Sequence, residues 1–221
     1  LQHRYWLNTP NTIRIPKIIQ LNVANQLGIN TPRTILTTSK KDLIEFSSSE
    51  SELIIKPIDN TLALTFEDGF FLLTYTTSID ETILQKIPET FFPCLIQARL
   101  DKEYEIRSFY IEGDFYSMAI FSQKGSNKTK IDFRNEDVNN KSRRVPYQLP
   151  KEVEVKLHQL MLRLGLNCGS FDIVKTREGE YVFLEVNPVG QFGMVSIPCN
   201  YYLEKIIAEH LFKKSIAIPI N

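Results

Sequence analysis

The sequence has little cysteine, no excess of either charge and no long apolar segment. Its cysteines are widely spaced and match no zinc or redox signature, so we expect reduced thiols in a cytoplasmic protein; they are Cys94, Cys168 and Cys199. Basic and acidic residues number 26 each, and this balance gives no general attraction to nucleic acid or to an anionic membrane. No apolar run approaches the roughly 20 residues of a membrane span, and no signal peptide opens the chain. We therefore predict neither nucleic acid nor membrane as a partner.

Hydrophobic residues make up 43% of the 221 residues, which is enough for a sizeable core in one large domain or two small ones. Apolar positions at helical spacing predict helices, and short apolar or alternating runs predict strands. We expect helices at 16–28, 40–46, 81–86, 150–165 and 197–213, and strands at 32–37, 52–57, 70–75, 93–100, 103–112, 115–122, 168–174 and 181–187. Helices interspersed with antiparallel hairpins predict the α+β class.

Two oxygen-bearing side chains close the strand at 181–187. Residues i and i+2 of a strand point to the same face, so Glu185 and Asn187 are expected side by side, and Pro188 ends the strand because it cannot donate to the ladder. Carboxylate and carboxamide oxygens suit a Mg²⁺ ion held against nucleotide phosphates. The alternative is an Asx turn, because Asn-Pro is ordinary turn chemistry.

A second acid, Asp172, favours the metal interpretation. It lies in the strand predicted at 168–174, and the polar segment 176–180 contains glycine, as a hairpin connection to 181–187 should. Asp172 then faces Glu185 across the ladder, and such a gathering of oxygen atoms on one sheet face is costly without a cation. The alternative is that Asp172 caps a turn and Glu185 pairs with a lysine.

Three further features are typical of a nucleotide site. Lys56 ends an apolar strand and suits a phosphate clamp, although an ordinary strand-end lysine looks the same. The strand at 93–100 leaves the core after Ala98, where exposed backbone groups can read adenine. Glu105 and Arg107 share a face, so the carboxylate can accept from ribose hydroxyls and the guanidinium can reach a phosphate. The alternative for these two is an exposed charge pair of little energetic weight.

The segment 122–149 is rich in lysine and arginine and places apolar anchors beside its arginines, at Phe133-Arg134 and at Val145-Pro146-Tyr147. This pattern favours a partly ordered loop over a polyanionic ligand, and a solvated charged loop is the alternative. A nucleic-acid interpretation is weaker, because acidic residues are interleaved with the basic ones.

Taken in order, these residues resemble the ATP-grasp superfamily, which has a strand-end lysine, a hinge strand, an Asp and a Glu-x-Asn pair. The chain from about Trp6 to Lys213 looks like the ATP-grasp part of peptide maturases of the microviridin-ligase and grasp-with-spasm type, the graspetide ligases. The matching segments are Trp6-Leu7-Asn8, 28–34, 54–57, 103–107, 116–123, Asp132-Phe133-Arg134, 143–150 and 185–193, of which the last two are specific to this branch.

The resemblance implies a role for each matching residue. Adenine is expected at the hinge and the ribose at Glu105, and the nucleotide-binding residues are expected to be Lys17, Lys56, Gln97, Ala98, Leu100, Glu105 and Asn187. The expected ligands of Mg²⁺, or of Mn²⁺ in its place, are Asp172, Glu185 and Asn187. The expected catalytic residues are three arginines near the transferred phosphate or the substrate carboxylate, namely Arg107, Arg134 and Arg143.

The resemblance also implies two α+β lobes whose antiparallel sheets clasp ATP. We expect a remnant or linker of a mostly absent upstream α/β domain at 1–15, a small lobe at 16–100 with a hinge at 97–101, and a large lobe at 101–221. The chain opens with Leu1 rather than Met, and a processed N-terminus is the alternative to a missing upstream part. The segment 59–62 lacks the Gly-rich phosphate loop of many ATP-grasp enzymes.

The function implied by the resemblance is that of an ATP-dependent carboxylate ligase. We expect it to activate Asp or Glu side chains of a ribosomally made precursor peptide as acyl phosphates and to join them to Ser or Thr hydroxyls as ω-esters; a lysine amine would give an ω-amide. The alternatives are a ligase that adds amino acids to a peptide or protein, and a truncated binding module without catalysis. We also expect a homodimer that binds the leader of the precursor near the hairpin 108–122 or the helix at 150, with a SPASM-type maturation protein as a further partner.

Overall fold

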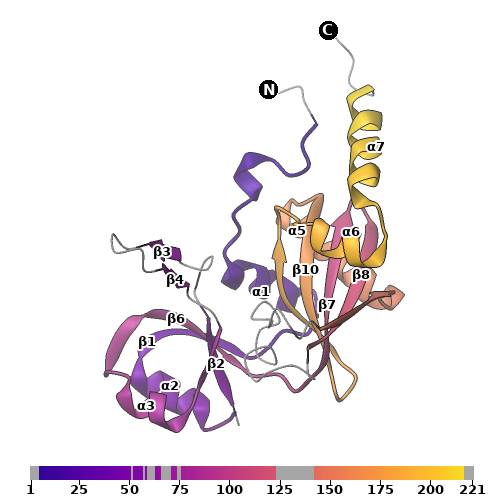
Figure 1. The fold of residues 1–221 in the computed structure, drawn as a ribbon. Helices are drawn as coiled ribbons and strands as arrows, with labels where there is room; N and C mark the ends of the chain where they lie inside the picture. Colours follow the sequence, from indigo (N-terminus) through magenta and orange to yellow (C-terminus); the bar gives the residue numbers. More distant parts are fainter. Residues whose placement is uncertain are drawn as a thin grey trace.

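The computed structural model of the protein describes residues 5–50, 52–56, 58, 63–65, 71–73, 76–122 and 142–216. It contains two antiparallel sheets, of four and five strands, and a pair of short strands, β3 (Ala63–Thr65) and β4 (Phe71–Leu73). Figure 1 shows the two larger sheets as the centres of two lobes, each covered by helices. The α+β class predicted from the sequence is confirmed.

The smaller lobe is built on the four-stranded sheet. In the order β1-β6-β2-β5, its strands are β1 (Thr34–Ser39), β6 (Thr90–Ala98), β2 (Leu53–Lys56) and β5 (Thr77–Ile79). The helices α2 (Lys40–Ser47) and α3 (Glu81–Lys86) cover one face of it (Figure 1). The buried core on that face consists of Leu43, Phe46, Leu53 and Ile96, with Ile35 and Ile55 packed against it. Because strand residues alternate between faces, Ile54 and Gln97 point to the opposite face.

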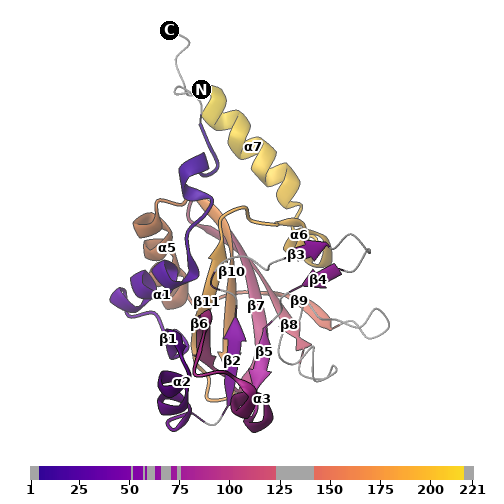
Figure 2. The ribbon, with the colours of Figure 1, turned by 90° about the vertical axis from the view of Figure 1, so that its left-hand side faces the viewer.

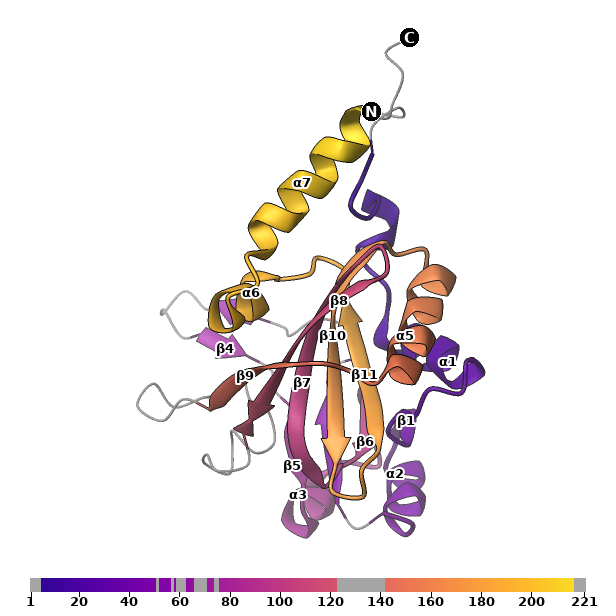
Figure 3. The ribbon, with the colours of Figure 1, turned by 90° about the vertical axis from the view of Figure 1, so that its right-hand side faces the viewer.

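The larger lobe is built on the five-stranded sheet. In the order β11-β10-β7-β8-β9, its strands are β11 (Tyr181–Asn187), β10 (Cys168–Thr176), β7 (Lys102–Ile111), β8 (Asp114–Phe121) and β9 (Arg143–Tyr147). The helices α1 (Lys17–Gln26) and α5 (Lys151–Leu164) lie on one side of this sheet and α6 (Gly193–Cys199) on the other (Figure 3). Residues 99–101 join the two sheets, within the predicted hinge at 97–101.

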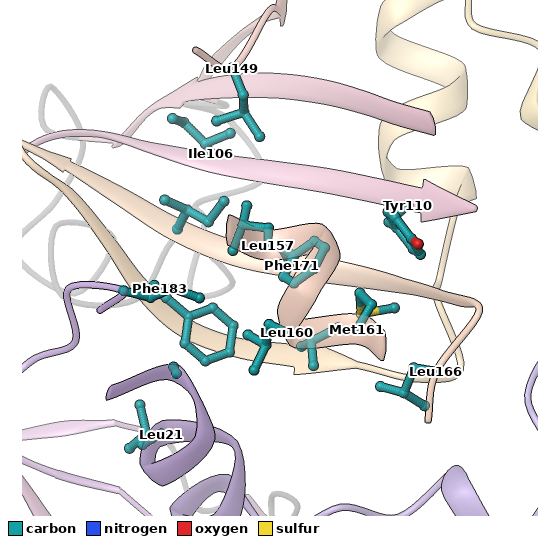
Figure 4. Packing of buried hydrophobic residues seen from close by; sticks show 14 residues of the cluster. Leu21, Ile106, Tyr110, Leu149, Leu157, Leu160, Met161, Leu166, Phe171 and Phe183 are labelled. Atoms are coloured by element: carbon teal, nitrogen blue, oxygen red, sulfur yellow. The ribbon is translucent and has the colours of Figure 1, made fainter. Parts of the chain in front are cut away.

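Each face of the larger sheet has its own core. Figure 4 shows the one beneath α1 and α5, where Leu157, Leu160 and Met161 of α5 pack on aromatic and aliphatic side chains of the strands, among them Tyr110, Phe171 and Phe183. The opposite face packs Phe109, Met118 and Ile120 against α6 and the start of α7 (Leu203–Ile216). Burying both faces fixes the register of the sheet, because a slip of one residue would exchange the two sets of side chains.

A β-bulge at the end of the sheet sets which residues of β11 share a face. Asp172 lies opposite Glu185, but the next pair is Ile173 with Phe183, so Leu184 is the extra residue. Phe183 consequently joins the core beneath α5, whereas Glu185 turns to the face of Asp172. Plain alternation would have put Phe183 and Glu185 on the same face.

The N-terminal segment belongs by its contacts to the larger sheet. The helix α1 packs on β11 and α5, and its Leu21 and Ala24 lie in the core of that lobe. Ahead of it, a short 3₁₀ helix spans Pro10–Thr12, and Tyr5 lies against His210 of α7. Figure 2 shows this part of the chain near the end of α7. The division of the chain at 1–15, 16–100 and 101–221 stays a prediction, and the packing of α1 is the observation that bears on it most directly.

Several elements differ from the prediction. The single helix expected at 197–213 is wrong: α6 ends at Cys199 and α7 begins at Leu203, because Asn200 and Tyr202 have left-handed backbone angles, with φ of 54° each. The strands β3, β5 and β9 were not expected either: β3 and β5 have three residues each, and the charged sequence of β9 has no clear alternation. In the part of the chain that the structure describes, no helix is both long and apolar enough to cross a membrane.

Candidate nucleotide and metal site

A cleft lies between the two sheets. In the smaller lobe it lies on the face of the sheet opposite to α2 and α3. Its wall includes Ile54, Lys56, Gln97 and Ala98 of the small sheet, with Pro32 just before β1 and Leu100 of the segment that joins the sheets. The large sheet contributes Lys102, Glu105, Asp172, Ile173, Leu184 and Glu185. Seven residues expected to hold a nucleotide or metal therefore line one cleft, although they come from five parts of the sequence: Lys56, then Gln97, Ala98 and Leu100, then Glu105, Asp172 and Glu185.

The acidic wall of the cleft is set by strand pairing. Asp172 lies in the middle of three strands, opposite Glu185 on β11 and opposite Arg107 on β7. Two residues earlier, Ser170 lies opposite Asn187. The sequence predicts the pairing of Asp172 with Glu185, and the structure contains it. The two carboxylates and the Asn187 carboxamide thus lie on one face of neighbouring strands.

Each of these two carboxylates is paired with a cation. Lys17, the first residue of α1, has its Nζ 3.1 Å from Oε2 of Glu185. Arg107 donates from Nη1 to Oδ1 of Asp172, and only 5% of the Arg107 side chain is exposed. Neutralisation of this kind is what a cluster of partly buried carboxylates requires. The alternative that Glu185 pairs with a lysine is therefore also present in the structure.

Arg107 is held on a second side as well. Its Nη2 donates to Oε1 of Gln191 over 3.3 Å, and Gln191 is a non-glycine residue with a φ of 43°. Such backbone angles in non-glycine residues cost energy and are found most often at functional sites. The Nε of Arg107 is buried without a hydrogen-bond partner among the described residues, which leaves one donor of a buried guanidinium unused.

Asn187 closes the turn that follows β11. Its Oδ1 accepts from the backbone N–H of Val189 over 3.0 Å, which is the Asx turn that the sequence offered as the alternative to metal binding. A carboxamide oxygen has two lone pairs, so this hydrogen bond leaves room for a cation. No cluster of three or more His, Cys, Asp or Glu side chains suited to a metal occurs in the described ranges. Any metal here would need phosphate or water oxygens beside the protein ligands, as Mg²⁺ at nucleotide sites has.

Glu105 and Lys102 form a buried pair on the floor of the cleft. The ammonium of Lys102 contacts Oε1 of Glu105, and both side chains are about nine-tenths buried. Burial raises the pKa of the Glu105 carboxyl above its ordinary value, while the charge of Lys102 and hydrogen bonds from Lys102 and Ser122 oppose that rise. A carboxylate held in this way is positioned to accept hydrogen bonds from a ligand hydroxyl.

The hinge residues differ in what they can offer a ligand. The backbone N–H of Ala98 donates to the carbonyl of Arg33 over 3.0 Å, so Ala98 can contact a base only through its carbonyl. The side chain of Gln97 is buried and its Oε1 has no partner in the described part of the protein. A buried acceptor of this kind, in a cleft beside apolar Ile54 and Leu100, fits the N–H groups and flat ring of a nucleobase.

Of the other two expected catalytic arginines, only Arg143 is among the described residues, and it lies apart from this group. Arg134 falls outside the residues that the structure describes. Arg143 lies on β9, the edge strand of the large sheet, with its guanidinium 5.9 Å from the centre of the Phe121 ring. The strands β8 and β7 separate β9 from Asp172 on β10, so Arg107 is the only one of the three that the described structure brings to the carboxylates.

Two residues hold the acidic strand in place and were not predicted. Gln20 of α1 accepts from the backbone N–H of Val186 over 2.7 Å. Asn8 is buried, has a φ of 66°, and donates from Nδ2 to the carbonyls of Cys168 and Pro188, over 2.8 and 2.6 Å. The resemblance included Asn8 only as part of the Trp6-Leu7-Asn8 segment, and no local pattern marks a lone asparagine as a partner of residues 160 and 180 positions away.

We expect the Gly190→Ala substitution to destabilise the protein by about 1–3 kcal/mol. Gly190 has a φ of 90°, and a Cβ there would lie 3.0 Å from Cε2 of the buried Phe109. Chemical denaturation measures the change in the free energy of unfolding. Gly193→Ala is the matched control, because its φ is ordinary and a Cβ there meets open space. Equal stability of the two variants would contradict the close approach at Gly190.

Comparison with known proteins supports the interpretation of this cleft as part of an ATP-grasp fold. No family model and no curated protein matches the sequence. Among solved structures, a RiPP-associated ATP-grasp ligase of Chryseobacterium gregarium, in complex with ADP and a leader and core peptide, superposes with a TM-score of 0.78 at 26% identity, over 85% of this chain and 56% of its own. The chain has the ATP-grasp fold.

Other ATP-grasp ligases match in the same way. The macrocyclase MdnC of Microcystis aeruginosa MRC, bound with its precursor peptide MdnA, has a TM-score of 0.80 at 26% identity and is matched over 94% of this chain and 63% of its own. The ATP-grasp ligase PsnB, complexed with a phosphomimetic variant of its minimal precursor, Mg and ADP, has a TM-score of 0.73 at 19% identity, over 94% and 61%. This chain thus spans less than two thirds of the length of these ATP-grasp ligases. The resemblance to ATP-grasp peptide maturases predicted from the sequence is confirmed.

Proposed function

We propose that this chain binds ATP between its two sheets and forms the nucleotide-binding part of an ATP-dependent peptide ligase. The observation that carries the proposal is the pairing of Asp172 with Glu185 on the wall of the cleft, each beside a cation. Paired carboxylate oxygens on the wall of a cleft are ligands that Mg²⁺ takes at nucleotide sites, and the two neighbouring cations suit phosphate oxygens. The likeness to solved ATP-grasp ligases supports the same conclusion.

In this proposal the nucleotide lies along the cleft. The adenine contacts the hinge through Gln97, the Ala98 carbonyl and the backbone of Leu100. The Glu105 carboxylate accepts from the ribose hydroxyls, and its buried pairing with Lys102 supports this role, because it fixes the carboxylate in one place. Lys56, at the end of β2, contacts the phosphates as a compact cation.

The residues present fit a divalent cation beside the phosphates. Asp172, Glu185 and Asn187 would hold Mg²⁺, or Mn²⁺ in its place, because two carboxylates and a carboxamide are hard oxygen donors. When bound, the ion offsets charge on the phosphate oxygens. With Glu185 on the ion, Lys17 would be left to pair with a phosphate oxygen. The Mg and ADP found with PsnB support this choice of ion.

The proposed reaction has two steps. A carboxylate oxygen of a peptide Asp or Glu attacks the terminal phosphorus of ATP, ADP leaves, and an acyl phosphate forms. A Ser or Thr hydroxyl of the same peptide then attacks the acyl carbon, loses its proton and expels phosphate, which gives an ω-ester. Arg107 is the residue that we assign to the charge developing on the substrate oxygens, because its guanidinium is buried and has an unused donor. Arg134 and Arg143 remain candidates for positioning the peptide.

The likeness to peptide-bound neighbours supports the choice of substrate class. The Chryseobacterium ligase is solved with a leader and core peptide and MdnC with its precursor peptide, so we propose a ribosomally made precursor with a leader as the partner. The two predicted docking regions for the leader lie together, since the hydroxyl of Tyr110 on the hairpin is 2.8 Å from Nδ1 of His158 on α5. A cytoplasmic homodimer and a SPASM-type maturation partner complete the proposal.

Mass spectrometry of the precursor after incubation with protein and ATP tests this function. The proposal predicts loss of one water per bond formed, together with release of ADP. A gain in mass by whole amino acids would identify the amino-acid ligase instead. Binding of nucleotide without ADP release would identify a binding module. To separate ester from amide, the product is treated with mild base, which cleaves an ω-ester and leaves an ω-amide intact.

A further inference from the structure

Gln97 presents a buried carboxamide to the cleft. Its neighbour Ile96 points into the core beneath α2 and α3, so Gln97 points to the other face, where it lines the cleft beside Ile54. Only 1% of the residue is exposed. A side chain this buried cannot exchange its hydrogen bonds with bulk water, so the direction of its carboxamide is decided by its protein neighbours.

Thr34 decides that direction. It lies directly opposite Gln97 in the β1–β6 ladder, and its hydroxyl donates to the carbonyl of Pro32 over 2.7 Å. A hydroxyl has a single hydrogen, so toward Gln97 the oxygen of Thr34 can only accept. The Nε2 of Gln97 therefore faces Thr34, over 3.0 Å. The carboxamide oxygen must then point the other way, and it is this Oε1 that has no partner among the described residues.

We infer that Thr34 and Gln97 together select the base of the nucleotide by the substituent at its six-position. This inference rests on the proposed nucleotide site. The fixed Oε1 accepts from the exocyclic amine of adenine, which satisfies a buried acceptor. Hypoxanthine and guanine carry a carbonyl oxygen at that position, and two acceptors would then face each other in a buried site. Thr34 contacts Gln97 and not the base, so it is a positioning residue.

The hydrogen bond from Gln97 to Thr34 matters because a glutamine without it discriminates poorly between bases. A freely turning carboxamide can offer its N–H groups to a carbonyl as readily as its oxygen to an amine. Held by Thr34, it offers only the oxygen, and a polar site left unpaired is what rejects the wrong ligand. The Thr34 hydroxyl does not contact the base, but through Gln97 it therefore sets the selectivity for adenine.

The test is to measure ADP and inosine diphosphate binding to the protein by calorimetry in the presence of Mg²⁺. We expect the wild type to prefer ADP by roughly 10- to 100-fold. Thr34→Val should reduce that preference to within a few-fold, because the carboxamide can turn. Thr34→Ser retains the hydroxyl and should keep the preference, and Gln97→Leu should abolish it.

Thr37→Val is the control for a merely structural effect. Thr37 lies on the same strand, is buried, and donates to Oδ2 of Asp42 over 2.8 Å, but does not line the cleft. Its substitution should lower stability without changing the ratio of the affinities for ADP and inosine diphosphate.

A Thr34→Val variant that keeps the full preference, or a wild type that binds both nucleotides equally, would overturn the inference without contradicting the proposed nucleotide site. A wild type that binds neither nucleotide would instead overturn the proposed function, and the inference with it.

Discussion

Replacing Glu185 by glutamine is expected to lower ATP turnover by about 100-fold or more, since even the partners that orient a metal ligand are worth 10- to 100-fold. The change removes one negative charge and keeps the size of the side chain. Because Asp172 faces Glu185 across the ladder, we expect Asp172→Asn to have a similar effect. The concentration of Mg²⁺ needed for half-maximal turnover should rise in both variants. Asn187→Ala should raise it less, because a neutral ligand is lost.

The measurement is ADP release against Mg²⁺ concentration, with thermal unfolding recorded in parallel. Glu154→Gln is the matched control, because Glu154 also pairs with a lysine, Lys151, over 3.2 Å, but on the surface of α5. Its turnover and Mg²⁺ dependence should match the wild type. If Glu185→Gln releases ADP with an unchanged Mg²⁺ requirement, the assignment of the metal site is wrong even though the carboxylates face each other.

The hairpin that carries the acidic pair could be predicted because its determinants are local. A Gly-containing polar turn between two apolar runs predicts a hairpin of strands 168–176 and 181–187, but the pairing of Ile173 with Phe183 would by itself bring Leu184 opposite Asp172. The bulge at Leu184 is what brings Glu185 there. The bulge at Leu184 could not be predicted, because it depends on Phe183 entering the core beneath α5. Without the bulge, Glu185 and Asn187 would still share one face, but it would be the face of Phe183 and not that of Asp172.

The positions of the two cations beside the acids, Lys17 and Arg107, could be known only from the tertiary structure. Lys17 lies 168 positions before Glu185 in the sequence, and its role follows from the packing of α1 on β11. The ion pair between Arg107 and Asp172 follows from the pairing of β7 with β10, two strands that are not consecutive in the sequence. The resemblance to a family named both residues, but neither a period nor a spacing in the sequence joins them to the acids.

The N-terminal segment contributes more to the site than a linker would. Asn8, Lys17 and Gln20 contact three successive parts of the acidic strand and its turn: the Pro188 carbonyl, the Glu185 carboxylate and the Val186 amide. A segment that contacts both side chain and backbone of a strand restricts its twist and its fraying. We therefore regard residues 8–20 as part of the support of the site.

Replacing Asn8 is the severest test of this support. Its side chain also accepts from the backbone N–H groups of Asn167 and Cys168, over 2.9 and 3.3 Å, in addition to its two donated bonds. Asn8→Ala leaves several buried backbone groups unpaired, each at a cost of about 1–3 kcal/mol. It also places alanine at a left-handed backbone position, which costs about 1–2 kcal/mol more. We expect the free energy of unfolding to fall by at least about 3 kcal/mol, measured by chemical denaturation.

The Asn8→Asp variant separates support of the turn from general stability. It keeps the oxygen that accepts from Asn167 and Cys168 but loses the donor to Pro188, and it sets a negative charge against two carbonyl oxygens. Hydrogen exchange at Val189 and Gly190, whose amides bond to Asn187, should therefore become faster. Tyr5→Phe is the control, since it loosens the same segment at Glu112 without touching the turn. If exchange in the turn rises equally in both variants, the segment acts only through overall stability. A rise confined to Asn8→Asp makes Asn8 the residue through which the N-terminal segment holds the turn at 187–190, which carries the Asn187 of the proposed metal site.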